Sequence, residues 1–120
     1  MKEYFRKRLD SFKYAFRGIG FLLGDTPNAV IHVVMAIFAL LFGLYFKIAT
    51  WEWISIIIAI GLVIGLEAVN TSIEKMADII TTDHNEDIKK IKDIAAAAVL
   101  VAAIMALIVG VVIFVPKIIN

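Results

Sequence analysis

Glu67, Asn70, Glu74 and Asp78 place four polar side chains on one face of a strongly apolar segment, which we call the acidic stripe. Their spacings of three, four and four residues keep them within about 80° of arc on a helix that turns about 100° per residue. Ionisable groups in or beside hydrocarbon cost a few kcal/mol each, so a stripe of them indicates a functional site.

The acidic stripe suits cation binding and proton transfer. Mg²⁺ prefers oxygen ligands and usually takes one or two carboxylates together with phosphate oxygens. Glu74 and Asp78, one turn apart, fit that role. Glu67 lies deeper in apolar surroundings, which suits a general base toward an alcohol, and Asn70 could orient either group or the substrate. The alternative is that the stripe only supplies hydrogen bonds between the helices of a bundle.

A group of lysines follows the stripe in the chain. Lys89, Lys90 and Lys92 precede Asp93, and together with residues 6–8 they could hold a polyphosphate. The alternative is that these cations only anchor the chain to anionic lipid. The sequence has neither a phosphate-binding glycine loop nor a dinucleotide fingerprint. It offers no nucleophilic triad, and we expect no nucleic-acid partner.

The composition is that of an integral membrane protein. The chain has 120 residues, of which 62% are hydrophobic, and a mean hydropathy of +0.92. These values are too apolar for a soluble domain of this size, and one domain is the natural count. The absence of cysteine excludes disulfides and thiolate metal sites.

Three stretches are long and apolar enough to cross a membrane. We expect a surface helix over residues 1–24 and spans over residues 27–46, 51–80 and 88–115. A polar loop over residues 81–87 connects the second and third spans. Thr26 and Pro27 suit the N-cap and first position of the first span, and Trp51 suits an interfacial belt at the start of the second. His32 is typical of a hydrogen-bonded span residue, and Pro116 is expected to end the third span.

Residues 1–24 are predicted to form an amphipathic helix. Phe5, Leu9, Phe12 and Phe16 recur every three or four residues, with basic residues around them. Such a helix lies in the headgroup layer of a membrane or packs on its own protein's core, and the pattern leaves both open. The glycine-rich stretch over residues 18–24 is expected to bend between this helix and the first span.

Charge asymmetry orients the spans. Ten of the twelve Lys and Arg precede the first span or lie between Lys75 and Lys92. The positive-inside rule therefore places the N-terminus and the loop over residues 81–87 in the cytoplasm. Glu67 lies about 16 residues, or roughly 24 Å, along the helix from Trp51, close to the cytoplasmic edge of a hydrocarbon core about 30 Å thick.

Small residues mark faces where helices could approach closely. They recur every four residues at Gly61 and Gly65, and again at Ala98, Ala102, Ala106 and Gly110. The close contacts could form within one bundle or between subunits. Three spans make a thin bundle, so we expect a homo-oligomer.

Several segments together resemble the small prokaryotic diacylglycerol kinase and undecaprenol kinase family. The clearest is Glu67–Asp78 (EAVNTSIEKMAD), followed by Lys92–Ala103 (KDIAAAAVLVAA), Phe12–Gly18 (FKYAFRG) and Asn28–His32 (NAVIH). The resemblance covers nearly the whole chain. The short form and the Asn28–His32 segment are more similar to the undecaprenol kinase branch.

The resemblance implies an all-α membrane fold with three spans and a surface helix, assembled as a homotrimer. It implies Mg²⁺-dependent transfer of the ATP γ-phosphoryl group to a lipid alcohol at the cytoplasmic face of the bacterial inner membrane. By motif position, Glu67 matches the catalytic base and Asn70 its polar neighbour. The positions that match metal or nucleotide contacts are Glu74 for the metal, Asp78, Lys92 and Asp93 for the nucleotide, and more loosely Tyr14, His84 and Asn85.

One position departs from the family pattern. The family commonly has a glutamate, a second metal carboxylate, two residues before the position of Asn28, where this chain has Thr26. Asp25, one residue away, is the candidate replacement, although both residues also suit a helix cap.

Two other functions are compatible with a carboxylate in a short apolar bundle. A small proton-coupled exporter would use Glu67 near mid-bilayer with access from both sides, and a structural assembly subunit would need no chemistry. The carboxylates crowd one edge beside a basic loop, which favours the kinase. The sequence does not choose between undecaprenol and diacylglycerol, and the preference for undecaprenol comes from the resemblance alone.

Overall fold

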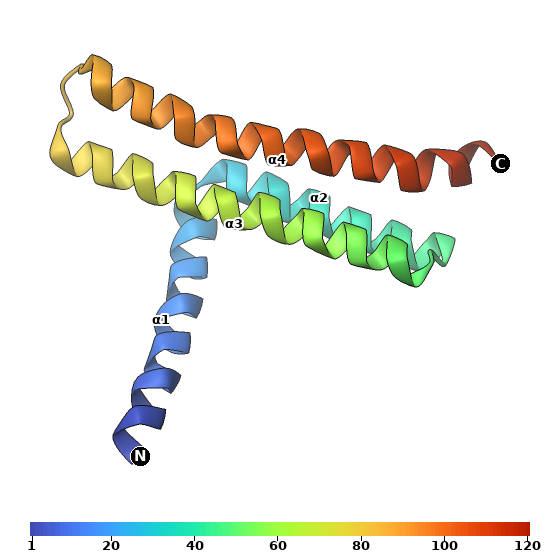
Figure 1. Cartoon of the computed structure of the whole chain (residues 1–120), viewed down its shortest axis with the longest axis horizontal. Helices are drawn as coiled ribbons and strands as arrows, with labels where there is room; N and C mark the ends of the chain where they lie inside the picture. Colours follow the sequence, from blue (N-terminus) through green and yellow to red (C-terminus); the bar gives the residue numbers. More distant parts are fainter.

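The computed structural model describes all 120 residues, and its regular structure is entirely α-helical. The four helices are α1 (Lys2–Asp25), α2 (Pro27–Phe46), α3 (Thr50–Ile80) and α4 (Glu86–Ile119) (Figure 1). By length and composition, α2, α3 and α4 could each cross a membrane. The all-α membrane fold with three apolar helices is therefore confirmed.

Helix α3 is the central element of the bundle. It runs beside both α2 and α4, while α1 leaves the bundle at a steep angle to the other helices (Figure 1). Its buried positions recur at helical spacing and include Ile56, Val63, Glu67, Asn70 and Ala77. The face that α3 turns toward its neighbours is thus apolar over most of its length and polar near its last third.

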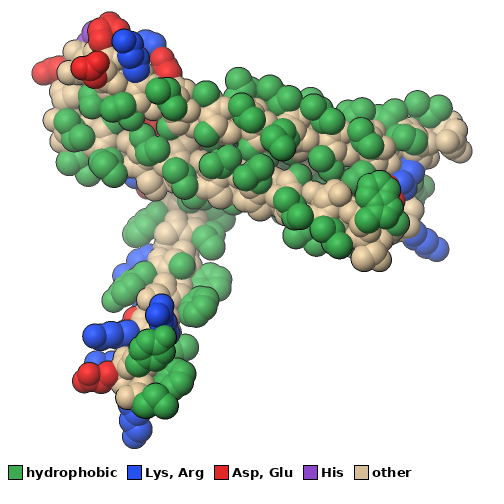
Figure 2. All heavy atoms as spheres, in the orientation of Figure 1, with side chains coloured by type: hydrophobic (Ala, Val, Ile, Leu, Met, Phe, Trp, Pro, Cys, Tyr) green, Lys and Arg blue, Asp and Glu red, His purple; other side chains and the backbone are tan.

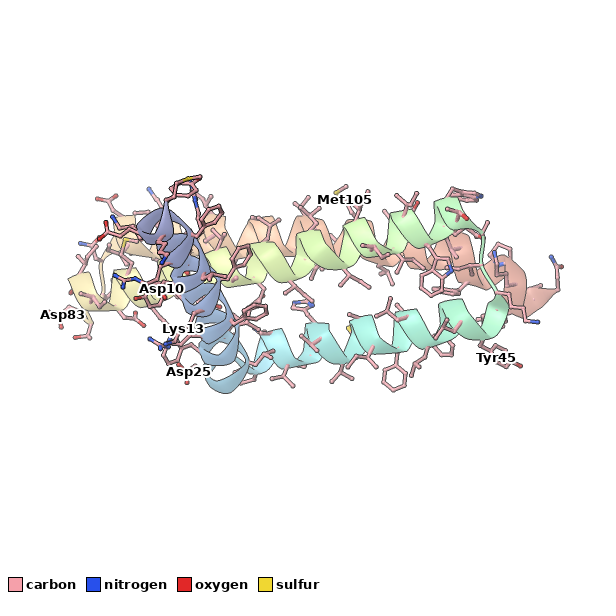
Figure 3. All side chains as sticks on the ribbon, turned by 90° about the horizontal axis from the view of Figure 1, so that it is seen from below. Asp10, Lys13, Asp25, Tyr45, Asp83 and Met105 are labelled. Carbon is pink, nitrogen blue, oxygen red and sulfur yellow. The ribbon has the colours of Figure 1, made fainter.

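The two ends of the bundle differ in charge. Asp83 and Tyr45 mark the two ends, and α1 leaves the bundle nearer the end that holds Asp83 (Figure 1 and Figure 3). We call these the α1 end and the far end. Charged side chains gather on α1 and around the α3–α4 connection, and hydrophobic side chains cover most of the bundle between the ends (Figure 2).

A small apolar cluster closes the far end. Ile48, Ile56 and Ile113 are buried there, and the ring of Trp53 packs against them. Gly43 lies against that ring, because a Cβ at this position would stand 2.6 Å from Trp53 Cη2. The indole can therefore approach α2 only where α2 has no side chain.

The predicted bend over residues 18–24 is wrong, because α1 continues without a break to Asp25. The turn falls at Thr26, whose backbone is extended (φ −123°, ψ 102°), and Pro27 opens α2 as predicted. A helix tolerates glycine at a cost of about 1 kcal/mol, whereas the residue before a proline is driven out of the helical region. The proline therefore sets the break.

Helix α4 is longer than the third predicted span at both ends. It begins at Glu86 because Asn85 caps it, with Oδ1 accepting from the amides of Asp87 (2.9 Å) and Ile88 (3.1 Å). It also continues through Pro116 to Ile119, so the expected end there is wrong. A proline in the last turn removes only one helical hydrogen bond, which is a small loss beside a helix of 34 residues.

Candidate functional site

Glu67 is buried between α2 and α3. Its side chain is 3% exposed, and its nearest ionisable partner is His32 on α2, with Nε2 3.6 Å from Oε2. That separation is longer than a hydrogen bond, although it is short enough for a direct electrostatic interaction. The sequence predicts that both residues lie near the same edge of the membrane, and the structure brings them together across two helices.

Unpaired polar atoms lie one turn further along α3. Asn70 Nδ2 donates to Glu74 Oε1 at 3.3 Å, but Asn70 Oδ1 and Thr71 Oγ1 are buried without a partner. Buried polar atoms almost always have a partner, so unpaired ones mark a strained or functional position. Thr71 is not among the predicted site residues, although its i+4 spacing from Glu67 puts it on the same side of the helix.

The acidic stripe changes character along its length. Glu67 and Asn70 are buried, Glu74 is half-buried and Asp78 is exposed. Asp78 Oδ1 accepts from Lys92 Nζ at 2.6 Å, which joins the end of α3 to the start of α4. The stripe therefore runs from the apolar interior of the bundle out to its charged end.

Asp25 forms an ion pair with α3. Lys75 Nζ donates to Asp25 Oδ2 at 3.4 Å, so the end of α1 is held beside the acidic stripe. No three His, Asp or Glu side chains gather closely enough to hold a metal ion by themselves. A magnesium ion that takes most of its ligands from phosphate and water needs fewer protein carboxylates, and half-buried Glu74 is a suitable donor for it.

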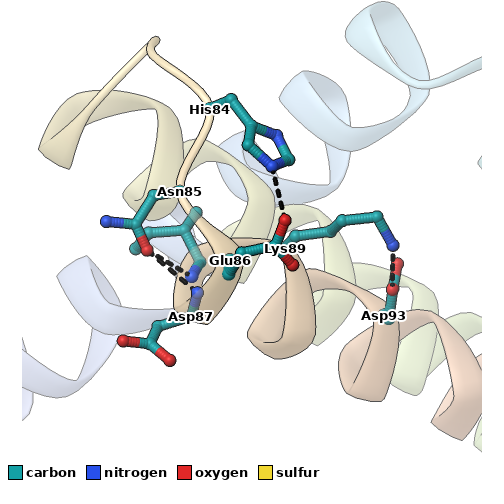
Figure 4. Close-up of polar contacts among 7 residues, drawn as sticks. His84, Asn85, Glu86, Asp87, Lys89 and Asp93 are labelled. Carbon is teal, nitrogen blue, oxygen red and sulfur yellow. Dashed lines mark hydrogen bonds and ion pairs between the residues drawn. The ribbon is translucent and has the colours of Figure 1, made fainter.

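The predicted nucleotide-side residues of the connection all have local partners (Figure 4). His84 Nε2 lies 2.7 Å from Glu86 Oε1, Asn85 caps α4, and Lys89 Nζ donates to Asp93 Oδ2 at 2.7 Å. Tyr14 lies on the exposed part of α1, 61% exposed, with the Arg17 guanidinium 5.7 Å from its ring centroid. The structure does not bring Tyr14 into contact with the stripe.

The site combines buried polar atoms that lack hydrogen-bond partners with a rim of lysines at the α1 end of the bundle. The Glu67 carboxylate accepts no hydrogen bond from another side chain, and the unpaired Asn70 Oδ1, three residues further along α3, can accept a hydrogen bond from a hydroxyl. Lys75 and Lys92 lie in partly exposed ion pairs nearby, where an anion could replace their present partners.

The sequence model for prokaryotic diacylglycerol kinase matches residues 13–114, which include every candidate site residue from Tyr14 to Asp93. The undecaprenol kinase of Bacillus subtilis (strain 168) is 38% identical over 107 residues, which are 89% of this chain and 87% of that protein. The diacylglycerol kinase of a Synechocystis species is 30% identical over 113 residues, 93% of this chain and 65% of that protein. The diacylglycerol kinase of Helicobacter pylori is 35% identical over 72 residues, 60% of this chain and 56% of that protein.

Proposed function

This chain belongs to the prokaryotic diacylglycerol kinase family and is a lipid kinase, and on that premise we propose that it transfers the γ-phosphoryl group of ATP to undecaprenol. Diacylglycerol is the second candidate substrate. The similarity to an undecaprenol kinase spans 87% of that protein, against 65% for the Synechocystis diacylglycerol kinase, and this favours undecaprenol. Family membership sets aside the exporter and the structural subunit.

The buried carboxylate of Glu67 carries the proposal. In the proposed step, Glu67 accepts the proton of the lipid hydroxyl while the hydroxyl oxygen bonds to the γ-phosphorus of ATP. The bond between the γ-phosphorus and the β–γ bridging oxygen breaks, and ADP leaves with that oxygen. No side chain donates a hydrogen bond to this carboxylate, so its oxygens are available to a lipid hydroxyl. His32 holds the carboxylate from the α2 side, and Asn70 Oδ1 orients the hydroxyl.

The nucleotide would lie toward the α1 end. Phosphoryl transfer depends chiefly on positioning and charge neutralisation. Lys92, now paired with Asp78, is placed to turn toward the phosphates, and Asp93, Tyr14, His84 and Asn85 complete the proposed nucleotide side. Glu74 would hold Mg²⁺, with Asp25 as the second carboxylate, and the bound ion would neutralise charge on the phosphates.

The membrane placement and assembly are part of the proposal. Helix α1 is exposed along most of its length and leaves the bundle at a steep angle, which suits a helix lying in the cytoplasmic headgroup layer. A Cβ at Gly61 or Gly65 would meet nothing within 4 Å, so this face of α3 is open to another copy of the chain. We propose a homotrimer in the bacterial inner membrane with the N-terminus in the cytoplasm.

A transfer assay tests the function. Purified protein in detergent is incubated with γ-³²P-ATP, Mg²⁺ and either undecaprenol or diacylglycerol, and label in the extracted lipid is counted. We expect a higher kcat/KM for undecaprenol, and a parallel reaction without Mg²⁺ to show little transfer. Label in neither lipid would contradict the proposed function, and a higher kcat/KM for diacylglycerol would reverse the substrate assignment.

A further inference from the structure

A lateral groove runs between α2, α3 and α4. Its volume is about 490 Å³, within the roughly 300–1,000 Å³ of small-molecule sites. Seventeen of the nineteen residues that line it are hydrophobic, and His32 is the only ionisable one. The groove is therefore built for an apolar occupant with one polar end.

The two ends of the groove are chemically different. At one end His32 lies 3.6 Å from Glu67, the proposed base. At the other end the ring of Phe114 on α4 meets Phe42 and Phe46 on α2, with centroids 6.1 and 6.2 Å apart. From His32 to Phe42 is ten residues, or about 15 Å of helix, half of a hydrocarbon core about 30 Å thick. The groove thus runs from His32, the neighbour of Glu67, to an aromatic group about halfway across the hydrocarbon core.

We propose that this groove binds the hydrocarbon tail of the lipid alcohol, with its hydroxyl at Glu67. The inference rests on the proposed function and adds to it where the substrate's tail lies. A lipid keeps its tail along the bilayer normal and its hydroxyl at the interface, which matches the direction and polarity of the groove. A polar or charged occupant would leave its own groups unpaired along nearly the whole length.

Small side chains give the groove its width. Ala36, Ala39, Ala59, Ala103, Ala106 and Gly110 all line it. A tail that moves there from the bilayer gains little hydrophobic free energy, since lipid is as apolar as the groove. Selectivity must therefore come from close packing, which depends steeply on shape. We expect the groove to discriminate tails by length and bulk and to have only a modest effect on turnover.

A tail-length series tests the groove. Isoprenoid alcohols that grow by one unit at a time are phosphorylated with the unsubstituted protein and with A106F. For the unsubstituted protein, KM should fall with length until the tail reaches about 15 Å and then level off. For A106F, KM for long tails should rise about tenfold, while the shortest alcohol keeps its KM and kcat. A36L, which narrows the opposite wall, should give the same pattern more weakly.

A97F is the matched control, because Ala97 is exposed on α4 and does not line the groove. It should keep the length dependence of the unsubstituted protein. The proposal is overturned if A106F and A36L also keep it. It is equally overturned if they lose activity at all lengths together with a change in oligomeric mass in detergent, since the groove would then be an interface between copies.

A binding measurement separates this inference from the proposed function. An isoprenoid alcohol with a photoreactive group at the end of its tail is crosslinked to the protein without ATP, and the labelled peptides are identified. Labelling near Phe42 and Phe114 supports the groove even if no lipid is phosphorylated. Labelling confined to other faces of the bundle overturns it even if undecaprenol proves to be the substrate.

Discussion

Two buried glutamates on α3 sit at different depths of the bundle and have opposite surroundings. At the far end, Glu52 is 6% exposed and saturated: Oε1 accepts from the amide of Ala49 at 2.9 Å, and Oε2 accepts from Lys117 Nζ at 2.7 Å. Toward the α1 end, Glu67 is 3% exposed, and its closest partner is His32 at 3.6 Å.

The difference fits a structural role for Glu52 and the proposed reactive role for Glu67. Each hydrogen bond that a carboxylate accepts stabilises its charged form and lowers its tendency to take a proton. Glu52 therefore holds the start of α3 to the end of α4, where Lys117 also donates to the carbonyl of Ile113 at 3.2 Å. Glu67 accepts no such hydrogen bond, and Asn70 Oδ1 and Thr71 Oγ1, three and four residues further along α3, are also unpaired. Burial alone would not distinguish the two acids.

Exchanging each glutamate for glutamine should give the largest contrast. E67Q should lower kcat by about 10²–10⁴-fold, the usual contribution of a general base, and leave the thermal midpoint nearly unchanged. E52Q should do the reverse, lowering the midpoint by several degrees because Lys117 loses its charged partner, with kcat of the folded protein retained. The measurements are lipid phosphorylation and thermal unfolding in detergent. Similar kcat losses in both variants would remove the distinction.

The sequence predicts part of this contrast, but it does not predict which residues pair with the two glutamates. The spacing of the acidic stripe predicts a common face, and the apolar run before it predicts that Glu67 is the deepest member. Nothing in the sequence distinguishes Glu52, because acidic residues are common in the first turn of a helix. Its partner Lys117 lies 65 residues away, and only the packing of α3 against α4 brings them together.

The contact between His32 and Glu67 is likewise predicted only in part. Their shared depth follows from the positions of the spans, whereas their approach depends on how α2 is rotated against α3. The start of α2 at Thr26 and Pro27 is predicted from the proline, whereas the bend expected at the glycines before it is wrong. The continuation of α4 past Pro116 could not have been predicted, because a proline beyond the first turn of a helix usually breaks or kinks it.

The packing at the far end gives the second prediction. G43A should lower the free energy of unfolding by about 1–3 kcal/mol, because its Cβ would stand 2.6 Å from Trp53 Cη2 and the indole is held between helices. Thermal unfolding in detergent measures the loss. G20A is the control, since a Cβ there meets nothing within 4 Å and should be neutral or stabilising by up to about 1 kcal/mol. Equal midpoints for G43A and the parent would show that this end repacks easily.

The α1-end partner gives the third prediction. H32F should lower kcat at saturating lipid about tenfold, equivalent to about 1.4 kcal/mol in the barrier, because Glu67 loses the one ionisable group that faces it from α2. H32Q keeps an N–H toward the carboxylate and should recover part of the loss. KM for ATP should stay the same in both variants. A purely structural role would instead change the thermal midpoint and leave H32Q no better than H32F.

The rim of ion pairs at the α1 end should show the smallest effect. Lys92 and Asp78 are both partly exposed, so their pair contributes no more than about 1 kcal/mol, and K92M should hardly change the thermal midpoint. If Lys92 turns toward the nucleotide, K92M should raise KM for ATP about two- to fivefold at unchanged kcat. Lys89, paired only with Asp93 on its own helix, supplies the control K89M, which should leave KM for ATP unchanged. Equal changes in KM for ATP in K92M and K89M would show that these lysines act only through their positive charge and not through a specific contact with the nucleotide. The contrast between the two ends of the bundle would then depend on Glu67 alone.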